Sequence, residues 1–187
     1  MKKILCLLLL LISTVVYGNQ NPVITNILNR KSVRKYLDKT VEQEKVDTIL
    51  QAAMAAPSAQ NKQVWEFIVV TDKNLLLEIG EKFPNAGYVK TAPMAIIVCG
   101  ANDVVGDYWP LECSAVTQNI LLAAESLDLG AIWCGLYCDE VAVKKAQKLF
   151  NLPFNIIPLN IIPIGYPAEK TEPKKKFKKE KIHINQW

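Results

Sequence analysis

Two short apolar runs constrain the fold of this 187-residue chain more than any other feature of its sequence. They are VWEFIVV at residues 64–70 and MAIIVCG at residues 94–100. Both are rich in β-branched residues and too short for buried helices, so they predict strands in the middle of a sheet. IPLNIIPIG at residues 157–165 predicts a last strand. Its two prolines lack the amide hydrogen that a ladder requires, so we expect this strand at an edge or with an irregular course.

Helical patterns alternate with these runs. A long apolar stripe predicts a helix from about residue 112 to 129 that stops at Gly130, and residues 131–137 then predict another short strand. The other helices are expected to begin at capping residues, namely Asn21 with Pro22, Thr40 with Gln43, Asp72 and Asp139. This alternation predicts an α+β or α/β domain in which helices cover a central sheet.

Size and composition allow one compact domain, because the chain is long enough for a substantial core and half of its residues are hydrophobic. A net charge of +4 is too small to indicate a nucleic-acid partner. The glycine motifs that cradle dinucleotides and triphosphates are absent from the sequence. The single histidine, His183, is five residues from the end of the chain, so neither a histidine metal cluster nor a Ser-His-Asp triad is expected.

The first 18 residues predict a signal peptide, which leaves residues 19–187 as the mature domain. Two lysines precede an apolar run at residues 4–16, and this run is short for a membrane span. Small residues precede a cleavage point after Gly18. We therefore expect an exported protein, periplasmic or secreted; the alternative is an uncleaved membrane anchor.

Four cysteines lie in the mature domain, and their spacing matches neither a thioredoxin motif nor a zinc site. We expect small buried thiols, although disulfides are permitted outside the cytoplasm. The sequence does not decide their redox state. The four are Cys99, Cys113, Cys134 and Cys138.

The only two arginines, among 22 basic residues, lie in one segment at residues 30–34. Arginine binds phosphate or carboxylate with two donors, whereas lysine acts as a point charge. Arg30, Lys31, Ser32 and Arg34 therefore predict a phosphate held by side chains. The alternative is a solvated basic loop.

A second candidate segment is APSAQNKQVW at residues 56–65, between a predicted helix and a predicted strand. Asn61 and Gln63 each carry a donor and an acceptor, so together they could bind the edge of a planar heterocycle. The alternative is ordinary turn chemistry, for which proline, serine and asparagine are common.

These two segments and two later ones follow one another in a characteristic order: RKSVR at 30–34, APSAQNKQVW at 56–65, SLDLGAIWCG at 126–135 and IGYPAEKTEPKKKF at 164–177. Together they resemble the nitroreductase family of FMN-dependent oxidoreductases. The resemblance extends from about residue 23 to the end of the chain. Two departures from the family pattern are Val64, where proline is usual, and Lys176, where arginine is common.

The resemblance implies a nitroreductase-like α+β fold with a central, mostly antiparallel sheet flanked by helices. It also implies an intertwined homodimer with a C-terminal extension and two FMN sites, each built from both chains. The arginine segment would surround the phosphate and the pyrimidine edge of the flavin, and the tail would complete the phosphate site. The other two segments would contact the flavin, one of them near N5. The residues implied to bind FMN are Arg30, Lys31, Ser32, Arg34, Pro57, Ser58, Asn61, Gln63, Trp133, Cys134, Gly135, Lys174 and Lys176.

By the same resemblance, electrons would pass from a reduced donor such as NAD(P)H through the flavin to nitroaromatic, quinone or related acceptors, with no catalytic acid or base and no metal. Two alternatives are a reductive dehalogenase and a non-catalytic FMN-binding or electron-relay protein. A third is an anion-binding module driven by the lysines of residues 174–181, which otherwise form a solvated run. Export conflicts with NAD(P)H, which is scarce outside the cytoplasm, so either the donor differs or the export prediction is wrong.

Three aromatic residues are candidate walls for a planar substrate. They are Tyr88, Trp109 and Trp133. Core packing is the favoured role for each of them, because aromatic side chains mostly serve burial.

Overall fold

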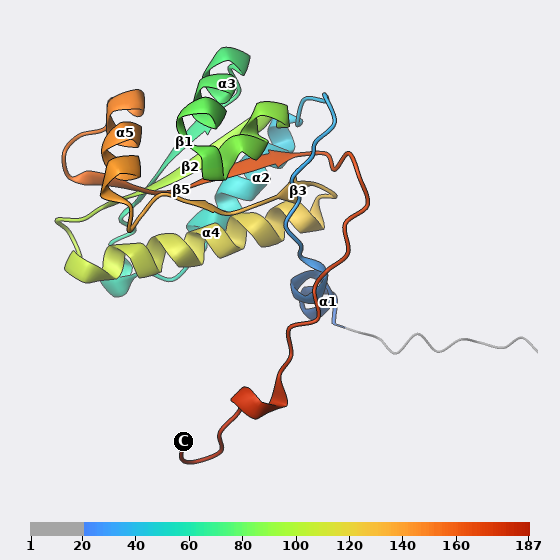
Figure 1. Ribbon diagram of the computed structural model, residues 1–187. Helices are drawn as coiled ribbons and strands as arrows, with labels where there is room; N and C mark the ends of the chain where they lie inside the picture. Colours follow the sequence, from blue (N-terminus) through green and yellow to red (C-terminus); the bar gives the residue numbers. More distant parts are fainter. Residues whose placement is uncertain (1–20) are drawn as a thin grey trace, which may run out of the picture.

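The computed structural model describes residues 21–187 (Figure 1). The predicted signal peptide at residues 1–18 therefore lies outside the described residues. The described chain forms an antiparallel sheet in the order β1-β2-β5-β3, with β4 also paired to β5. The expected α+β architecture with an antiparallel sheet is thus confirmed. The strands are β1 (Trp65–Val70), β2 (Met94–Ala101), β3 (Gly130–Ala131), β4 (Cys134–Gly135) and β5 (Ile156–Gly165).

Strand β2 lies in the middle of the sheet and is buried along almost its whole length, as expected. The same expectation is wrong for β1, which is an edge strand paired only with β2. Its apolar run is interrupted by Glu66, and both Glu66 and Val69 are exposed. One charge in a short apolar run is therefore a better guide to an edge than the run itself.

Strand β5 is central and not at an edge, because β2 pairs with one side of it and β3 and β4 with the other. The expected irregularity is present in the pairing of β5 with β2. Val98 of β2 pairs with Asn160 but Cys99 pairs with Pro158, so the register shifts between these two residues. Pro163 lies opposite the break between β3 and β4, and Pro158 lies beyond the end of β4. Both prolines are thus tolerated where β5 has no partner on that side. The single strand expected at residues 131–137 is accordingly two short strands.

The helices are α1 (Pro22–Asn29), α2 (Gln43–Met54), α3 (Lys73–Lys82), α4 (Trp109–Ser126) and α5 (Glu140–Phe150), with 3₁₀ turns η1 (Ala59–Asn61), η2 (Pro84–Thr91), η3 (Gly106–Tyr108) and η4 (Lys179–Lys181). Asn21, Asp72 and Asp139 cap their helices through side-chain oxygens, as expected. The expected cap at Thr40 is wrong, since α2 begins one residue after Glu42. Helix α4 begins about three residues earlier than expected, because a proline fits its first turn.

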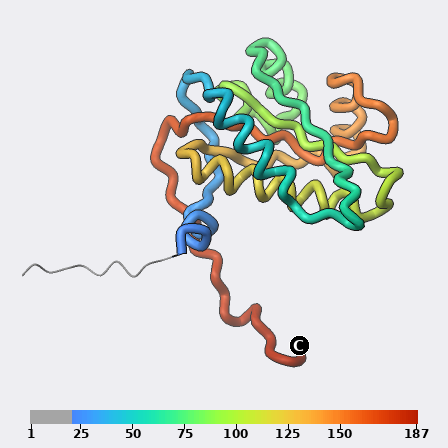
Figure 2. Tube along the Cα trace, turned by 180° about the vertical axis from the view of Figure 1, so that it is seen from behind, coloured from blue at the N-terminus to red at the C-terminus, as the bar shows by residue number. Residues whose placement is uncertain are grey.

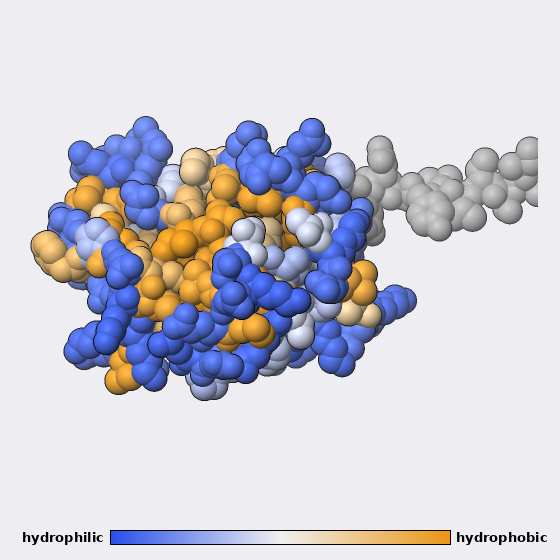
Figure 3. Space-filling model, turned by 90° about the horizontal axis from the view of Figure 1, so that it is seen from above, coloured by the Kyte–Doolittle hydropathy of each residue, from blue (hydrophilic) through white to orange (hydrophobic). Residues whose placement is uncertain are grey.

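Two helical layers sandwich the sheet (Figures 1 and 2). Helices α2 and α4 pack on one face through a cluster that includes Ile49 and Ile120. Helices α3 and α5 and the turn η2 pack on the other face, where Ile79 and Phe83 are buried. Each fully buried side chain of this kind contributes roughly 1.5–3 kcal/mol. On the side of α3 and α5, seen from above, hydrophobic side chains gather in the middle and hydrophilic ones surround them (Figure 3).

Helix α1 and the C-terminal tail stand apart from this core. No residue of α1 is buried, and Asn26 Nδ2 attaches the helix to α4 by donating to the Leu122 carbonyl at 3.0 Å. The tail passes α1 and ends well away from the sheet (Figure 1). Exposed apolar residues on α1 and the tail are Val23, Ile24, Ile27, Leu28, Phe177, Ile182, Ile184 and Trp187.

The buried-thiol expectation holds for three of the four cysteines in residues 21–187, and all four thiols are free. Burial raises the pKa of Cys99 and of Cys113 to about 12. The expectation is wrong for Cys138, which is exposed in a loop with a positive φ of 74°.

Candidate functional site

The arginine segment leaves α1 at Arg30 and runs extended beside β3. Ser32 forms a parallel bridge with Ala131, and Val33 N donates to the Ala131 carbonyl at 3.1 Å. A Cβ at Gly130 would lie 2.6 Å from the Val33 side chain, so only glycine allows this close approach. Val33 is therefore buried, while Arg34, which follows it, is exposed.

These cations line a cleft of about 240 Å³, which we call the cationic cleft. It joins the arginine segment to the tail, 140 residues further along the chain. Six of the residues expected to surround a phosphate come together here. The lining residues are Arg30, Lys31, Ser32, Arg34, Thr171, Glu172, Lys174 and Lys176.

The charge of the cationic cleft is strongly positive. Its one acid, Glu172, is paired with Lys170 at 2.9 Å. Lys31 is also paired, because its Nζ donates to Glu125 Oε1 of α4 at 2.7 Å, and both side chains are largely buried. Two arginines and the two tail lysines remain to attract an anion. Lys31 thus serves partly to attach the segment to α4.

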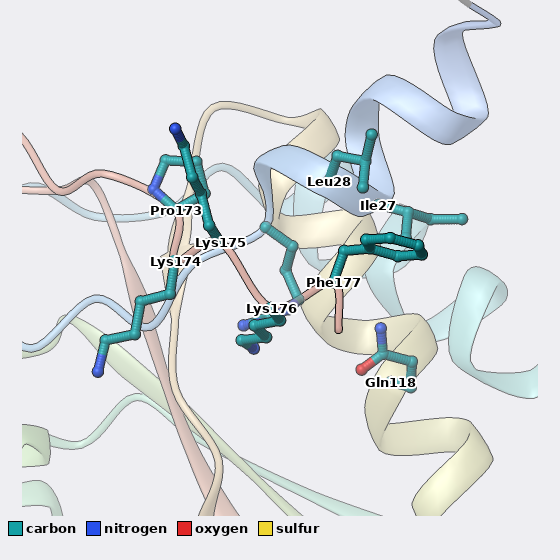
Figure 4. A pocket seen from close by; sticks show the side chains of 9 residues that line it. Ile27, Leu28, Gln118, Pro173, Lys174, Lys175, Lys176 and Phe177 are labelled. Atoms are coloured by element: carbon teal, nitrogen blue, oxygen red, sulfur yellow. The ribbon is translucent and has the colours of Figure 1, made fainter. Parts of the chain in front are cut away.

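A larger groove of about 690 Å³ adjoins the cationic cleft. Figure 4 shows that the tail crosses it between α1 and α4, with Ile27 and Leu28 on one wall and Gln118 on another. Lys175 and Phe177 line this groove and not the cleft.

The loop around Trp133 lies beside the arginine segment, because Ser32 pairs with Ala131 and Arg34 lies near Cys134. Cys134 is buried, and burial raises the pKa of its thiol to about 11, although nearby Arg34 opposes the shift. Trp133 and Gly135 are exposed on either side of it. A buried, protonated thiol is a poor nucleophile at neutral pH, so Cys134 provides shape and not reactivity.

Two residues of η2 also contact this region, and one of them, Asn85, was not expected there. Asn85 Nδ2 donates to the Gly135 carbonyl at 2.6 Å, and the Arg34 guanidinium lies 5.5 Å from the centre of the Tyr88 ring. The sequence offered Tyr88 as a candidate aromatic wall, and its ring is 38% exposed. Core packing is thus the wrong role for Tyr88 and also for Trp133. It is the correct role for Trp109, which is buried.

Residues 57–63, which we call the amide loop, connect α2 to β1. Ser58 Oγ accepts from Gln63 N at 3.0 Å, and Gln63 Nε2 donates to Asn61 Oδ1 at 2.9 Å. Gln60, Asn61 and Gln63 have positive φ angles of 52°, 57° and 51°. Three such residues within four positions make a strained loop of a kind often found at binding sites.

The structure does not bring the amide loop to the cationic cleft within one chain. Ala59 of the loop contacts Glu112 in the first turn of α4, whereas Lys31 of the cleft contacts Glu125 in its last turn. At a rise of about 1.5 Å per residue, these two acids lie roughly 20 Å apart along the helix. The expected site residues thus form two groups at opposite ends of α4.

Within residues 21–187, no group of three or more histidine, cysteine or acidic side chains is arranged to hold a metal ion. The same part of the chain has no helix that combines the length and the hydrophobicity of a membrane span.

Comparisons with known proteins agree with this fold. The sequence profile of the Nitroreductase family matches residues 27–109 and 82–166. A protein of Methanothermobacter thermautotrophicus with the provisional name NADH dehydrogenase/NAD(P)H nitroreductase is 44% identical over 167 residues, which cover 88% of this chain and 87% of that protein. The chain therefore belongs to the Nitroreductase family.

Solved structures give the same result. A protein of Parabacteroides distasonis with the same provisional name superposes with a TM-score of 0.88 at 46% identity, covering 90% of this chain and 100% of the other. An FMN-dependent nitroreductase from Clostridium difficile superposes with a TM-score of 0.82 at 32% identity, covering 88% and 99%.

Proposed function

We propose that the protein is an FMN-dependent oxidoreductase that passes electrons from a reduced donor such as NAD(P)H to nitroaromatic compounds, quinones or related acceptors. Membership of the Nitroreductase family supports the enzyme class and the cofactor. The observation that carries the proposal is the cationic cleft, where cations from both ends of the chain converge on one small volume.

The donors of the cationic cleft fit the phosphate of FMN. Arg30 and Arg34 supply planar guanidinium groups, which bind phosphate with two parallel hydrogen bonds. Ser32 adds a hydroxyl, and Lys174 and Lys176 add two point charges. This set replaces the backbone amides of a glycine-rich loop, which the sequence lacks.

A second copy of the chain would complete the site. We propose a homodimer in which the amide loop of one protomer faces the cationic cleft of the other. The separation of roughly 20 Å along α4 supports this arrangement, because one chain alone leaves the two halves apart. The exposed apolar residues of α1, which the described chain leaves uncovered, provide a surface for such an interface.

When bound, FMN supplies two-electron redox chemistry, and the protein contributes position and electrostatics. The cations of the cleft would hold the phosphate end. Arg34 lines the cleft and also lies near Cys134 and the Tyr88 ring, so its fixed charge would stabilise negative charge that develops on a bound flavin near it. The exposed rings of Tyr88 and Trp133 offer apolar surface to a planar acceptor. No side chain is assigned as a catalytic acid or base.

A visible spectrum of the purified mature protein tests the cofactor. We expect the absorption of oxidised flavin and the release of FMN on denaturation. Turnover is then measured with NADH, NADPH and a chemical reductant against nitrofurazone, a quinone and a halophenol. Colourless protein that cannot be reconstituted with FMN would overturn the proposal. Reduction of the halophenol alone would favour the dehalogenase alternative.

We also propose export after removal of residues 1–18 as a signal peptide. Mass spectrometry of the mature protein from its native host tests this separately, because the expected N-terminus is Asn19. An N-terminus at Met1 together with a cytoplasmic location would contradict export and remove the conflict with an NAD(P)H donor.

A further inference from the structure

Glu112 is the only buried charged side chain among residues 21–187, at 5% exposure. It lies in the first turn of α4, where the positive end of the helix dipole favours a carboxylate. Its Oε1 accepts a hydrogen bond from Ala59 N at 2.6 Å. Its Oε2 is buried and has no hydrogen-bond partner in the described chain.

The hydrogen bond between Ala59 and Glu112 connects the amide loop to another part of the protein. Every other hydrogen bond made by residues 57–63 in the described chain stays within the loop. The Glu112 carboxylate is thus the one hydrogen-bonding group that attaches the loop to the body of the protein. Burial of a carboxylate destabilises the fold unless its oxygens accept hydrogen bonds. Because Oε2 accepts none, the hydrogen bond from Ala59 to Oε1 must offset part of this destabilisation.

The loop needs such an attachment because its backbone is strained. Left-handed conformations at non-glycine residues are unfavourable, and the loop holds three of them. A hydrogen bond to a charged group is stronger than one between two neutral groups. Glu112 therefore favours this conformation of the loop before any ligand binds.

We propose that Glu112 is a positioning residue for the cofactor site. It acts through the Ala59 amide and holds the amide loop in the conformation that presents Ser58, Asn61 and Gln63 to FMN. This inference rests on the proposed function, since those three residues can contact FMN only if the protein binds FMN at this site.

The test compares Glu112→Ala and Glu112→Gln with the wild type. Glutamine keeps an oxygen that can accept the Ala59 bond, whereas alanine removes it. We expect Glu112→Ala to raise the FMN dissociation constant about tenfold or more, and Glu112→Gln to raise it by no more than about threefold. The readouts are fluorescence titration with FMN and hydrogen exchange of the Ala59 amide, which should accelerate only in Glu112→Ala.

Asn119→Ala is the matched structural control. Asn119 Nδ2 donates to the Ala52 carbonyl at 2.9 Å, so it also joins α4 to α2 but does not contact the amide loop. This variant should change FMN affinity by less than about twofold even if its melting temperature falls. If Glu112→Ala does not fold, Glu112→Asp replaces it, because its shorter side chain keeps the charge but reaches Ala59 poorly; we expect about fivefold weaker binding.

Equal FMN affinities of the wild type and Glu112→Ala, or equal weakening by alanine and glutamine, would overturn the positioning role. Failure of the wild type to bind FMN would instead overturn the proposed function, so the two failures are distinct.

Discussion

The cationic cleft and the amide loop are the two halves of the proposed FMN site, and they are built in opposite ways. The cleft is assembled within one chain by a strand-like bridge at Ser32, an ion pair at Lys31 and a returning tail. The amide loop is strained, bonded mainly to itself and attached to the body by one carboxylate. In the proposed dimer, the phosphate half is preformed within one protomer, and the amide loop that completes the site comes from the other protomer.

The largest single effect is expected at the preformed half. Arg30→Ala removes a charged bidentate donor and should raise the FMN dissociation constant about thirtyfold, the equivalent of about 2 kcal/mol. Lys175→Ala is the control, because Lys175 lines the neighbouring groove and not the cleft. Fluorescence titration in parallel gives both values, and equal values would show that the cleft is not the phosphate site.

The sequence allowed the local features to be predicted, because their determinants are close together in the chain. Asn21, Asp72 and Asp139 are examples, since each caps the helix that follows it directly. The order of the strands could not be predicted in this way. An apolar run indicates burial, but whether β1 or β5 is central depends on pairings between distant segments.

The same limit applies to the candidate site. The arginine segment and the tail could be assigned together only through the family resemblance, because 140 residues separate them. Asn85 carried no signal at all, since its importance comes from the position of η2 beside the Gly135 carbonyl. The separation of the amide loop from the cleft could be seen only once the length and position of α4 were known.

A smaller effect is expected where the β3–β4 loop meets η2. Asn85→Ala removes the donor to the Gly135 carbonyl, and loss of one neutral hydrogen bond of about 1 kcal/mol should weaken FMN binding about fivefold. Asn155→Ala is a suitable control, because its hydrogen bonds to Asp103 join two loops away from the candidate site. Similar affinities for Asn85→Ala and the wild type would remove this loop from the binding surface.

A change in the ion pair between Lys31 and Glu125 should strengthen FMN binding, whereas the variants above weaken it. Glu125→Gln keeps an acceptor for Lys31 but removes a negative charge next to the cleft. FMN should then bind about threefold more tightly at low salt, and the difference should fade as the ionic strength rises. Titration at two salt concentrations measures this, and weaker binding at both would mean that Glu125 positions Lys31 and does not merely neutralise it.

The smallest effect is expected on the pH dependence of stability, and it concerns Glu42, which lies after the arginine segment in the chain. A hydrogen bond from the Tyr166 hydroxyl lowers the pKa of Glu42 to about 2. The folded-state pKa lies below the unfolded value of about 4.3, so the carboxylate stabilises the fold above that pH and loses its contribution as the pH falls towards 2. Tyr166→Phe should flatten the dependence of the melting temperature on pH in this interval, and an unchanged profile would contradict the assignment.

The most direct test of the two-chain site is complementation. One variant carries Arg30→Ala with Arg34→Ala, the other carries Ser58→Ala with Asn61→Ala, and the two are co-expressed with different affinity tags. If each site combines the cleft of one protomer with the amide loop of the other, the purified heterodimer has one intact site and should bind half the FMN of the wild-type dimer. A heterodimer that binds no more FMN than either variant alone would contradict the account.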